Sequence, residues 1–538
     1  MTNLVSLTLE GVSYQLPDGR TLFANLTEQF GTQSTGLVGR NGIGKSILAR
    51  ILAGELAPTT GKYACPGRVH YLPQQISIRA GQTVAGLAGV QGVMEALKRI
   101  ALGSCAPADF DTIGDRWDIH QQLEQQLANH RLSHLNADTP AIQLSGGEAM
   151  RVSLIGAFLA AADFLILDEP TNHLDQENRH ALLEQLQRWQ NGLVVISHDR
   201  ALLETMGRIV ELSAQGLRSY GGGYSFYAQA KAAEQENAVE QLQQRKAERK
   251  REDRALRAQR EKLEQRQAKG HKQAADANQA KILLGLQKNR SESSSGKLRL
   301  KQDAAHEELS ARVREAAGQV DEDVPVVVYA PETGQAIPSK IAALDRVVLP
   351  FVAGPAREVE LSLHKAQRIG VIGPNGSGKS TLLRVIAGII APASGNCETF
   401  VKTAYLDQHL ATLAPDKTIL EQLLALNNVL GESALRTRLA QLGLNAERVL
   451  LPAHLLSGGE RLKAALACAL YADQPAQLLL LDEPGNHLDL ASIQALETML
   501  RQYRGAFVVV SHDPAFLENI ALTDRLEVAQ SGWAMERW

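Results

Sequence analysis

Two pairs of adjacent residues, Lys45 with Ser46 and Lys379 with Ser380, each close a glycine-rich segment that could hold phosphate. The segments read GRNGIGKS and GPNGSGKS, and each follows a short apolar run. Glycines at this spacing let successive backbone N–H groups turn toward a phosphate, and the helix that follows aims its positive end at the same charge. The lysine would meet the β- and γ-phosphates, and the serine hydroxyl suits Mg²⁺, which prefers oxygen ligands. The alternative is a glycine turn with a surface lysine, and two copies behind two apolar runs argue against it.

Two acidic pairs, Asp168 with Glu169 and Asp482 with Glu483, close the apolar runs FLIL and LLLL. Such runs are typical of buried parallel strands, and ligands bind at the carboxyl ends of these strands. The aspartate can hold Mg²⁺ through water, and the glutamate can polarise the water that attacks a γ-phosphate. A carboxylate pair that merely caps a strand end in solvent is the alternative.

The same motifs recur in the same order in both halves of the chain. LSGGE stands at 144–148 and 456–460, and 30 residues separate Asp168 from His198 and Asp482 from His512. The chain is therefore a duplication. The segment Ser-His-Asp is no hydrolase triad, because consecutive side chains do not converge in space. Each histidine is a candidate sensor of the γ-phosphate, and the alternative is a satisfied residue at the rim of a sheet.

These motifs together resemble the nucleotide-binding domains of the ATP-binding cassette superfamily, in which the LSGGE signature of one domain covers the ATP held by the P-loop of the other. The resemblance implies an α/β fold with two P-loop cassettes that bind ATP and Mg²⁺. It assigns nucleotide binding to two P-loops, at Gly39, Arg40, Asn41, Gly42, Ile43, Gly44, Lys45 and Ser46, and at Gly373, Pro374, Asn375, Gly376, Ser377, Gly378, Lys379, Ser380 and Thr381. It assigns the covering role to Ser145, Gly146, Gly147 and Glu148, facing the second P-loop, and to Ser457, Gly458, Gly459 and Glu460, facing the first.

The resemblance also implies a division of roles within each site. The expected catalytic residues are Glu169, His198, Glu483 and His512. The expected ligands of Mg²⁺ are Ser46, Gln74, Asp168, Ser380, Gln408 and Asp482, with each glutamine in a YLxQ frame that matches the family's glutamine loop. Tyr14 is a candidate for stacking on adenine or else a core residue, and Phe351 is a weaker equivalent in the second half.

The composition favours a soluble, cytoplasmic protein of three or four domains. The chain has 538 residues, and no apolar run approaches the ~20 residues that a membrane helix needs. The N-terminus lacks the layout of a signal peptide, and the four cysteines lie far apart without a CxxC. We therefore expect neither a zinc site nor a disulfide framework.

A long helix rich in Ala, Gln, Glu, Lys and Arg is predicted between the halves, because residues 226–268 contain no Pro or Gly. Gly270 then permits a turn, a tip runs to about residue 297, and residues 303–317 return as a helix with Leu309, Val313 and Ala316 on one face. Residues 245–300 hold 17 Lys and Arg against 7 Asp and Glu, a net charge of +10 in a chain of −3. Such a basic stripe favours a nucleic-acid partner, contacted through phosphates or RNA shape, over a merely solvated spacer.

Two fused cassettes and a basic helical linker resemble the ABC-F subfamily, as do PTNHLD at 170–175 and YGGGYSFY at 220–227. The resemblance implies a ribosome partner, in which the linker tip faces peptidyl-tRNA and rRNA. We expect a monomer whose own cassettes pair, with a first cassette at 1–215, a helical-hairpin linker at 216–322 and a second cassette at 323–538. The first half has 69 residues between glutamine loop and signature against 47 in the second, which matches the subfamily's arm insertion, here at about 80–135.

The expected function is therefore an ATP-hydrolysing translation factor. An antibiotic-resistance factor that protects the ribosome would use the same chemistry, and the ATPase subunit of a membrane transporter would share the cassette motifs but lack the basic linker. Excision-repair ATPases need cysteine clusters, and chromosome-type ATPases need far longer coiled coils. Two departures from the family pattern are Gly485, where threonine is usual, and Ile47, after the first P-loop.

Overall fold

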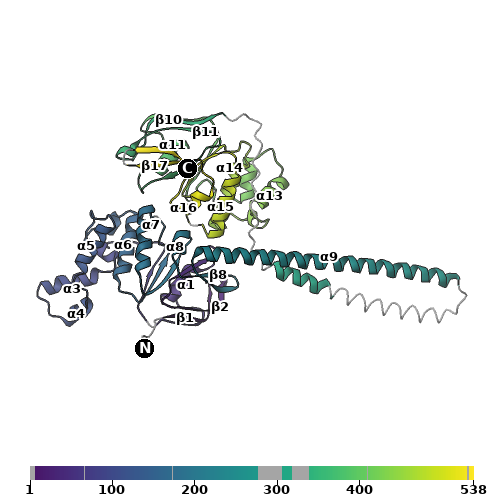
Figure 1. Ribbon diagram of the computed structural model, residues 1–538, viewed down its shortest axis with the longest axis horizontal. Helices are drawn as coiled ribbons and strands as arrows, with labels where there is room; N and C mark the ends of the chain where they lie inside the picture. The colour runs from purple at the N-terminus through teal and green to yellow at the C-terminus, as the bar shows by residue number, and fades with distance from the viewer. Residues whose placement is uncertain are drawn as a thin grey trace. The chain divides into compact units, whose positions relative to one another are not determined.

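The computed structural model describes residues 6–65, 67–172, 174–276, 304, 306–317, 338–408, 410–486, 488–529 and 532–538. It divides into two compact units, one made of Met1–Phe226 together with Val324–Trp538 and the other of Tyr227–Asp323. The first unit holds both cassettes (Figure 1).

The first cassette contains a six-stranded sheet, parallel except for its last strand, and a three-stranded antiparallel sheet. In spatial order the larger sheet comprises β5 (Val69–Leu72), β6 (Phe164–Asp168), β7 (Gly192–Ile196), β3 (Thr35–Gly39), β8 (Arg208–Ser213) and β9 (Gly216–Gly221). The smaller sheet comprises β2 (Thr21–Phe30), β1 (Leu7–Gln15) and β4 (Thr60–Ala64).

The second cassette repeats this arrangement, and the repetition confirms the predicted pair of α/β cassettes. Its larger sheet comprises β14 (Thr403–Leu406), β15 (Leu478–Asp482), β16 (Ala506–Val510), β12 (Arg368–Ile372), β17 (Asp524–Ala529) and β18 (Gly532–Arg537). Its smaller sheet comprises β11 (Glu358–His364), β10 (Lys340–Val348) and β13 (Ser394–Thr399). The apolar runs before the acidic pairs form β6 and β15, in which every residue is buried, as expected of central parallel strands.

Four helices in each cassette position the nucleotide motifs. In the first cassette they are α1 (Lys45–Leu52), α6 (Gly146–Leu159), α7 (Gln176–Arg188) and α8 (Arg200–Glu204). Their counterparts in the second are α11 (Lys379–Ile386), α14 (Gly458–Leu470), α15 (Leu490–Gln502) and α16 (Pro514–Asn519). Because each pair of helices follows the same motif, the duplicated sequence produces the same local scaffold twice.

The segment between glutamine loop and signature is helical in both cassettes and longer in the first. The first cassette has α2 (Val84–Leu87), α3 (Gln91–Ala101), α4 (Pro107–Ile113) and α5 (Ile119–Asn129) there, and the second has α12 (Ile419–Leu426) and α13 (Glu432–Gln441). Asp109 of α4 accepts hydrogen bonds from Arg99 of α3 at 2.6 and 2.9 Å and from Ser104 at 2.7 Å, which ties α3 to α4.

The linker helix α9 spans Tyr224–Asp276, 53 residues, so the predicted long helix is confirmed. At ~1.5 Å per residue it is roughly 80 Å long. The predicted turn at Gly270 is wrong: the helix continues through it, because one glycine costs only about 1 kcal/mol among strong helix formers. Most of the predicted tip lies outside the described residues.

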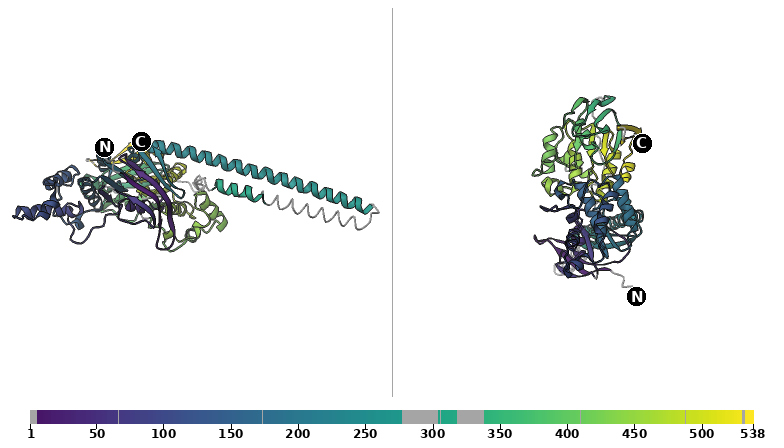
Figure 2. Two further views of the ribbon diagram at one scale, coloured as in Figure 1. Left: turned by 90° about the horizontal axis from the view of Figure 1, so that it is seen from below. Right: turned by 90° about the vertical axis from the view of Figure 1, so that its left-hand side faces the viewer.

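A second helix, residues 306–317, lies beside α9, as Figure 1 and the left view of Figure 2 show. His306 Nε2 lies 3.4 Å from Asp253 Oδ1 on α9, and Val313 and Ala316 are buried, in agreement with the predicted apolar face. No helix in the described part of the chain is both long and apolar enough to cross a membrane.

Candidate nucleotide-binding sites

Both P-loops end in a glycine with left-handed backbone geometry, Gly44 at φ 108° before α1 and Gly378 at φ 94° before α11. Neither helix start is capped by a side chain, so its first N–H groups face the loop. Lys45 Nζ donates to the carbonyl oxygen of Gly39 at 2.6 Å, and Lys379 Nζ donates to those of Gly373 at 2.8 Å and Pro374 at 2.7 Å. Each loop thus presents N–H groups and an ammonium on one concave surface, which suits a phosphate chain.

The oxygen ligands expected for Mg²⁺ lie next to one another. Ser380 Oγ donates to Asp482 Oδ1 at 2.9 Å, and the hydroxyl of Tyr405 donates to Asp482 Oδ2 at 2.9 Å. In the first site the hydroxyl of Tyr71 donates to Asp168 Oδ2 at 3.2 Å, and burial raises the pKa of Asp168 despite Lys45 nearby. A hydroxyl and a carboxylate side by side fit a hard divalent cation.

The glutamates after these aspartates have a strained backbone and buried side chains. Glu169 has φ 50° and Glu483 has φ 49°, a region that non-glycine residues rarely adopt and that often marks functional sites. Burial raises the pKa of Glu169 to about 8 and that of Glu483 to about 7, although Lys45 and Lys379 lower the respective values. Each glutamate is thus poised near neutral pH, as a general base should be.

A histidine lies against each of these glutamates. His198 Nε2 is 3.5 Å from Glu169 Oε1, and His512 Nε2 is 3.3 Å from Glu483 Oε1. Burial lowers the pKa of both imidazoles to about 3, so at pH 7 both rings are neutral. A neutral ring can donate from one nitrogen and accept at the other, which suits contact with both a phosphate and an attacking water.

A cavity of about 820 Å³ joins the signature of the first cassette to the P-loop of the second. The expected residues that line it are Ser145, Gly146, Gly147, Glu148, Asn375, Gly376, Gly378, Lys379, Ser380, Thr381, Gln408, Glu483 and His512. The side chain of Phe351 also lines it and is 95% exposed. This cavity therefore collects residues that are more than 200 positions apart in the sequence.

A smaller cavity of about 450 Å³ lies over the P-loop of the first cassette. The expected residues that line it are Asn41, Gly42, Gly44, Lys45, Ser46, Gln74, Asp168, Glu169 and His198. The signature residues Ser457, Gly458 and Gly459 are not among its lining residues, so their covering role stays a prediction. Gly458 instead lines a cavity of about 240 Å³ that also contains Gln408.

The structure does not bring Tyr14 to this cavity. Tyr14 lies in β1 with its ring centroid 6.3 Å from that of Phe23, and it packs on the hydrophobic core. The pairing of β1 with β2 places Tyr14 opposite Phe23, which corresponds to the core alternative for this residue. Leu16, Arg20 and Leu22 line the cavity in its place.

Each signature serine caps the helix that follows it. Ser145 Oγ accepts from the backbone N–H of Glu148 at 3.3 Å while Glu148 accepts from the backbone N–H of Ser145 at 2.8 Å. Ser457 and Glu460 form the same reciprocal box. Glu148 and Glu460 therefore hold the turn, which leaves the glycine N–H groups as the donors for a ligand.

Two aspartates that sequence reasoning missed connect the cassettes. Asp489 Oδ2 accepts from the backbone N–H of Asn41 at 3.0 Å, and the backbone N–H of Asn375 bonds Asp175 in the equivalent way. Burial opposes ionisation of both carboxyls, yet these hydrogen bonds and those of the helix starts hold their pKa values below the ordinary range. The repeated NHLD motif, which ends at each aspartate, was the signal available in the sequence.

The two departures from the family pattern have different surroundings. A Cβ added to Gly485 would meet nothing within 4 Å, so space does not explain the missing threonine. Its counterpart in the first cassette, Thr171, is buried. Ile47 packs on the core and lines the first cavity, as Thr381 lines the second.

Sequence comparison finds the same two modules. The sequence profile described as ABC transporter matches residues 28–172 and 356–486. The tylosin resistance ATP-binding protein TlrC of Streptomyces fradiae is 30% identical over 544 residues, 94% of each chain. The energy-dependent translational throttle protein EttA of Mycobacterium tuberculosis is 32% identical over 514 residues, 90% of this chain and 84% of the relative.

A plant relative and a solved structure extend these comparisons. ABC transporter F family member 5 of Arabidopsis thaliana is 30% identical over 522 residues, 91% of this chain and 70% of the relative. The archaeal ribosome recycling factor aABCE1, crystallised with the stalk protein aP1, aligns with a TM-score of 0.55 and 18% identity over 98% of this chain and 89% of that chain, a likeness of fold. Cassettes of this family bind ATP and in general hydrolyse it. Because the profile matches more than half of the chain and these relatives align over at least 90% of it, the protein belongs to the ABC transporter family and, within it, to the ABC-F proteins.

Proposed function

We propose that the protein is an ATP-hydrolysing translation factor that binds the ribosome with its cassettes closed on ATP and acts on peptidyl-tRNA through its linker. The supporting observation is α9, which exposes Lys246, Lys250, Arg251, Arg254 and Arg257 along a helix of 53 residues. Cations displayed in this way suit the phosphates of folded RNA, and residues 245–300 carry the net charge of +10 noted above. The relatives' names support a ribosomal role, since EttA is described as a translational throttle.

Within each ATP site the roles follow from chemistry and position. Glu169 and Glu483 would orient and deprotonate the attacking water, and His198 and His512 would contact the γ-phosphate. Mg²⁺ would be held in the first site by Ser46, Gln74 and Asp168 and in the second by Ser380, Gln408 and Asp482. When bound, it would stabilise the negative charge that develops on the phosphate oxygens.

ATP would favour the closed pair of cassettes because the closed state contacts each nucleotide from both sides. Hydrolysis removes those contacts and so releases the ribosome. We therefore expect Glu169→Gln combined with Glu483→Gln to trap a closed, ribosome-bound protein, and its expression to stop growth. Unimpaired growth on this variant would argue against the proposal.

The direct test is co-sedimentation of this double variant with purified 70S ribosomes in ATP across a salt series. Binding should require ATP, and reversing Lys246, Lys250 and Arg254 to Glu should weaken it and flatten the salt dependence. The log–log slope should fall by roughly one unit for each phosphate that the linker no longer neutralises.

A matched control reverses Lys62, Lys340 and Lys365, three exposed lysines outside the linker, and should leave binding unchanged. Equal weakening by both sets would show that net charge, rather than the linker, governs binding. No binding at low salt would overturn the ribosomal proposal.

A second candidate, a factor that protects the ribosome from an antibiotic, is favoured by the match to TlrC, which covers 94% of both chains and whose name states tylosin resistance. The two candidate functions predict different effects on the tylosin resistance of a cell that expresses the protein. Expression in a macrolide-sensitive host should raise the inhibitory concentration of tylosin only for a protection factor. An unchanged inhibitory concentration with ATP-dependent ribosome binding would favour the translation factor.

A further inference from the structure

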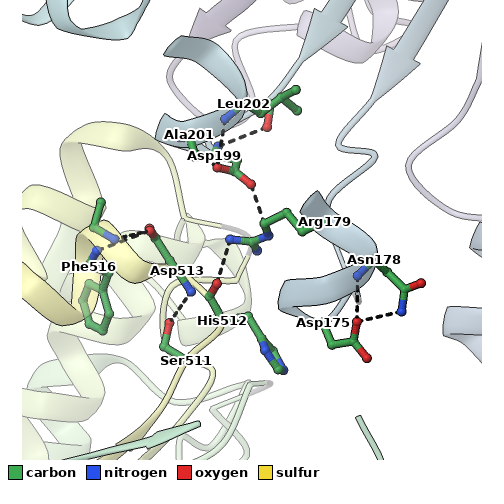
Figure 3. Close-up of polar contacts among 12 residues, drawn as sticks. Asp175, Asn178, Arg179, Asp199, Ala201, Leu202, Ser511, His512, Asp513 and Phe516 are labelled. Carbon is green, nitrogen blue, oxygen red and sulfur yellow. Dashed lines mark hydrogen bonds and ion pairs between the residues drawn. The ribbon is translucent and has the colours of Figure 1, made fainter. Parts of the chain in front are cut away.

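A single arginine, Arg179 on α7 of the first cassette, contacts His512 of the second cassette and Asp199, the residue after His198, of the first (Figure 3). Its Nη1 donates to the carbonyl oxygen of His512 at 3.0 Å. Its Nε lies 3.2 Å from Asp199 Oδ2, directly after His198. The side chain is 14% exposed and that of Asp199 4%, so solvent screens these contacts little.

The guanidinium also lies near two carboxylates, Asp199 and Asp513, each of which caps the start of a helix. Asp199 accepts from the backbone N–H groups of Ala201 and Leu202 at the start of α8, and Asp513 accepts in the same way at the start of α16. Burial and the charge of Asp199 raise the pKa of Asp513, whereas Arg179 and Arg200 lower it. Removing Arg179 would weaken this compensation, so the two buried carboxylates would repel each other more strongly across the cassette contact.

The second cassette has no arginine at the position that matches Arg179. The motifs align with an offset of 314 residues, from Asp168 to Asp482 and from His198 to His512, which places Ile493 opposite Arg179. Ile493 is 4% exposed and has no charge or hydrogen-bonding group to offer to the segment after His198. Both residues line one cavity of about 50 Å³ that also contains Glu169 and Glu483. At this pair of matching positions, therefore, only the second site has its histidine segment held by a cation from the opposite cassette.

We propose that Arg179 is a positioning residue for ATP hydrolysis at the second site, the site of Lys379, Glu483 and His512, and that it makes the two sites unequal. By fixing the carbonyl of His512, Arg179 sets where the imidazole meets the γ-phosphate and the attacking water. A misplacement of about 1 Å at such a group can cost 100-fold in rate. The first site has Ile493 at the matching position and hydrolyses ATP without an equivalent contact. This inference rests on the hydrolytic part of the proposed function.

The test isolates each site and measures turnover without ribosomes. Glu169→Gln leaves only the second site able to hydrolyse ATP, and Glu483→Gln leaves only the first. In each background Arg179 is changed to Ile, which copies the other cassette, to Met, which keeps length without charge, and to Lys. His180→Ala, an exposed neighbour on the same helix, is the matched control, and thermal melting shows whether each variant is folded.

We expect Arg179→Ile and Arg179→Met to lower kcat of the second site on the order of 100-fold while KM for ATP changes less than about threefold, because the arginine positions a group and does not bind the nucleotide. The first site should lose less than about fivefold. Arg179→Lys should recover part of the loss, since an ammonium can meet the carbonyl or the carboxylate but lacks the planar fork.

Three results would overturn the inference: equal losses in both backgrounds, a change confined to KM, or no change in kcat for a folded variant. A different result, unchanged turnover in the variant that combines Glu169→Gln with Glu483→Gln and keeps Arg179, would instead refute the assignment of the glutamates. Because ribosomes are absent from the assay, failure of the ribosomal proposal would leave this test untouched.

Discussion

Removing one partner of the buried ion pair between Arg200 and Glu497 should open the cassettes by different amounts according to which partner is removed. Arg200 Nη1 of the first cassette donates to Glu497 Oε1 of the second at 2.7 Å, and the side chains are 8% and 10% exposed. The guanidinium also lies 5.7 Å from the ring centroid of Tyr224, at the start of α9. Loss of one member of such a pair costs about 3–5 kcal/mol, because the other charge stays buried without compensation.

The two single changes differ because only one of the remaining charges can be neutralised. Burial raises the pKa of Glu497 although Arg200 lowers it, so Arg200→Met raises that pKa further and lets the carboxyl take up a proton. Arginine does not lose its proton in the accessible pH range, so Glu497→Leu leaves a permanent buried cation. Glu497→Leu should therefore cost more than Arg200→Met. Lowering the pH from 8 to 6 should shrink only the cost of Arg200→Met.

The assay measures the distance between two labels, one on an exposed position of each cassette, as ATP is titrated. It uses the double Glu→Gln variant, which does not hydrolyse ATP, and its readout is the ATP concentration at which half of the molecules are closed. A loss of about 3 kcal/mol is roughly a 100-fold change in the closing equilibrium, and with two nucleotides bound it raises this concentration about tenfold. The double change Arg200→Met with Glu497→Leu should recover much of the loss, because a packed apolar pair replaces an ionic one at little net cost. Equal single effects that simply add in the double variant would refute the reasoning.

Three further predictions concern other parts of the chain. Lys45→Met and Lys379→Met should each weaken one of two ATP-binding events by about 10- to 100-fold, the 1.5–3 kcal/mol of a hydrogen bond to a charged group, measured by calorimetry. Gly156→Ala should lower the melting temperature, because its Cβ would clash with the carbonyl oxygen of Ala88, whereas Gly92→Ala, whose Cβ would meet nothing within 4 Å, should not. Hydrogen bonds from Arg99 and Ser104 hold the pKa of Asp109 below its usual range, so its stabilisation is complete above about pH 4 and disappears as the pH falls through the lowered pKa. Hydrogen exchange of α3 and α4 should therefore be faster in Asp109→Asn than in the parent at pH 6, and this difference should shrink as the pH falls below about 4. Equal exchange at pH 6 would contradict this.

The sequence predicted the parts of each site that depend on local geometry. A glycine-rich loop before a helix, and an acidic pair after a buried strand, each follow from a few consecutive residues, so the P-loops, β6 and β15 and the 53-residue helix could be expected. Tyr14 shows the limit of this reasoning. Its distance from the P-loop was compatible with an adenine contact, but the pairing of β1 with β2 places its ring against Phe23. Such a choice between two faces of a strand requires the register of the neighbouring strand.

The contacts between cassettes could not be predicted, because they depend on which helix faces meet. Asp489 reaches Asn41 across 448 residues, and Arg200 reaches Glu497 across 297. A comparison of the two copies would have supplied one clue. At the same 314-residue offset, Arg200 matches Pro514 and Glu497 matches Leu183, so a charged residue in one copy stands against an apolar one in the other.

These differences give the contact between cassettes a direction. The first cassette supplies the cations Arg179 and Arg200, and the second supplies their acceptors, the carbonyl oxygen of His512 and the carboxylate of Glu497. Two first cassettes would place Arg200 near Leu183, and two second cassettes would place Glu497 near Pro514, each leaving a charge buried without a partner. Pairing of unlike cassettes is therefore favoured over pairing of like ones. Fusion in one chain supplies the unlike partner at a high effective concentration. The divergence of the two copies and their covalent linkage therefore both favour pairing of the first cassette with the second.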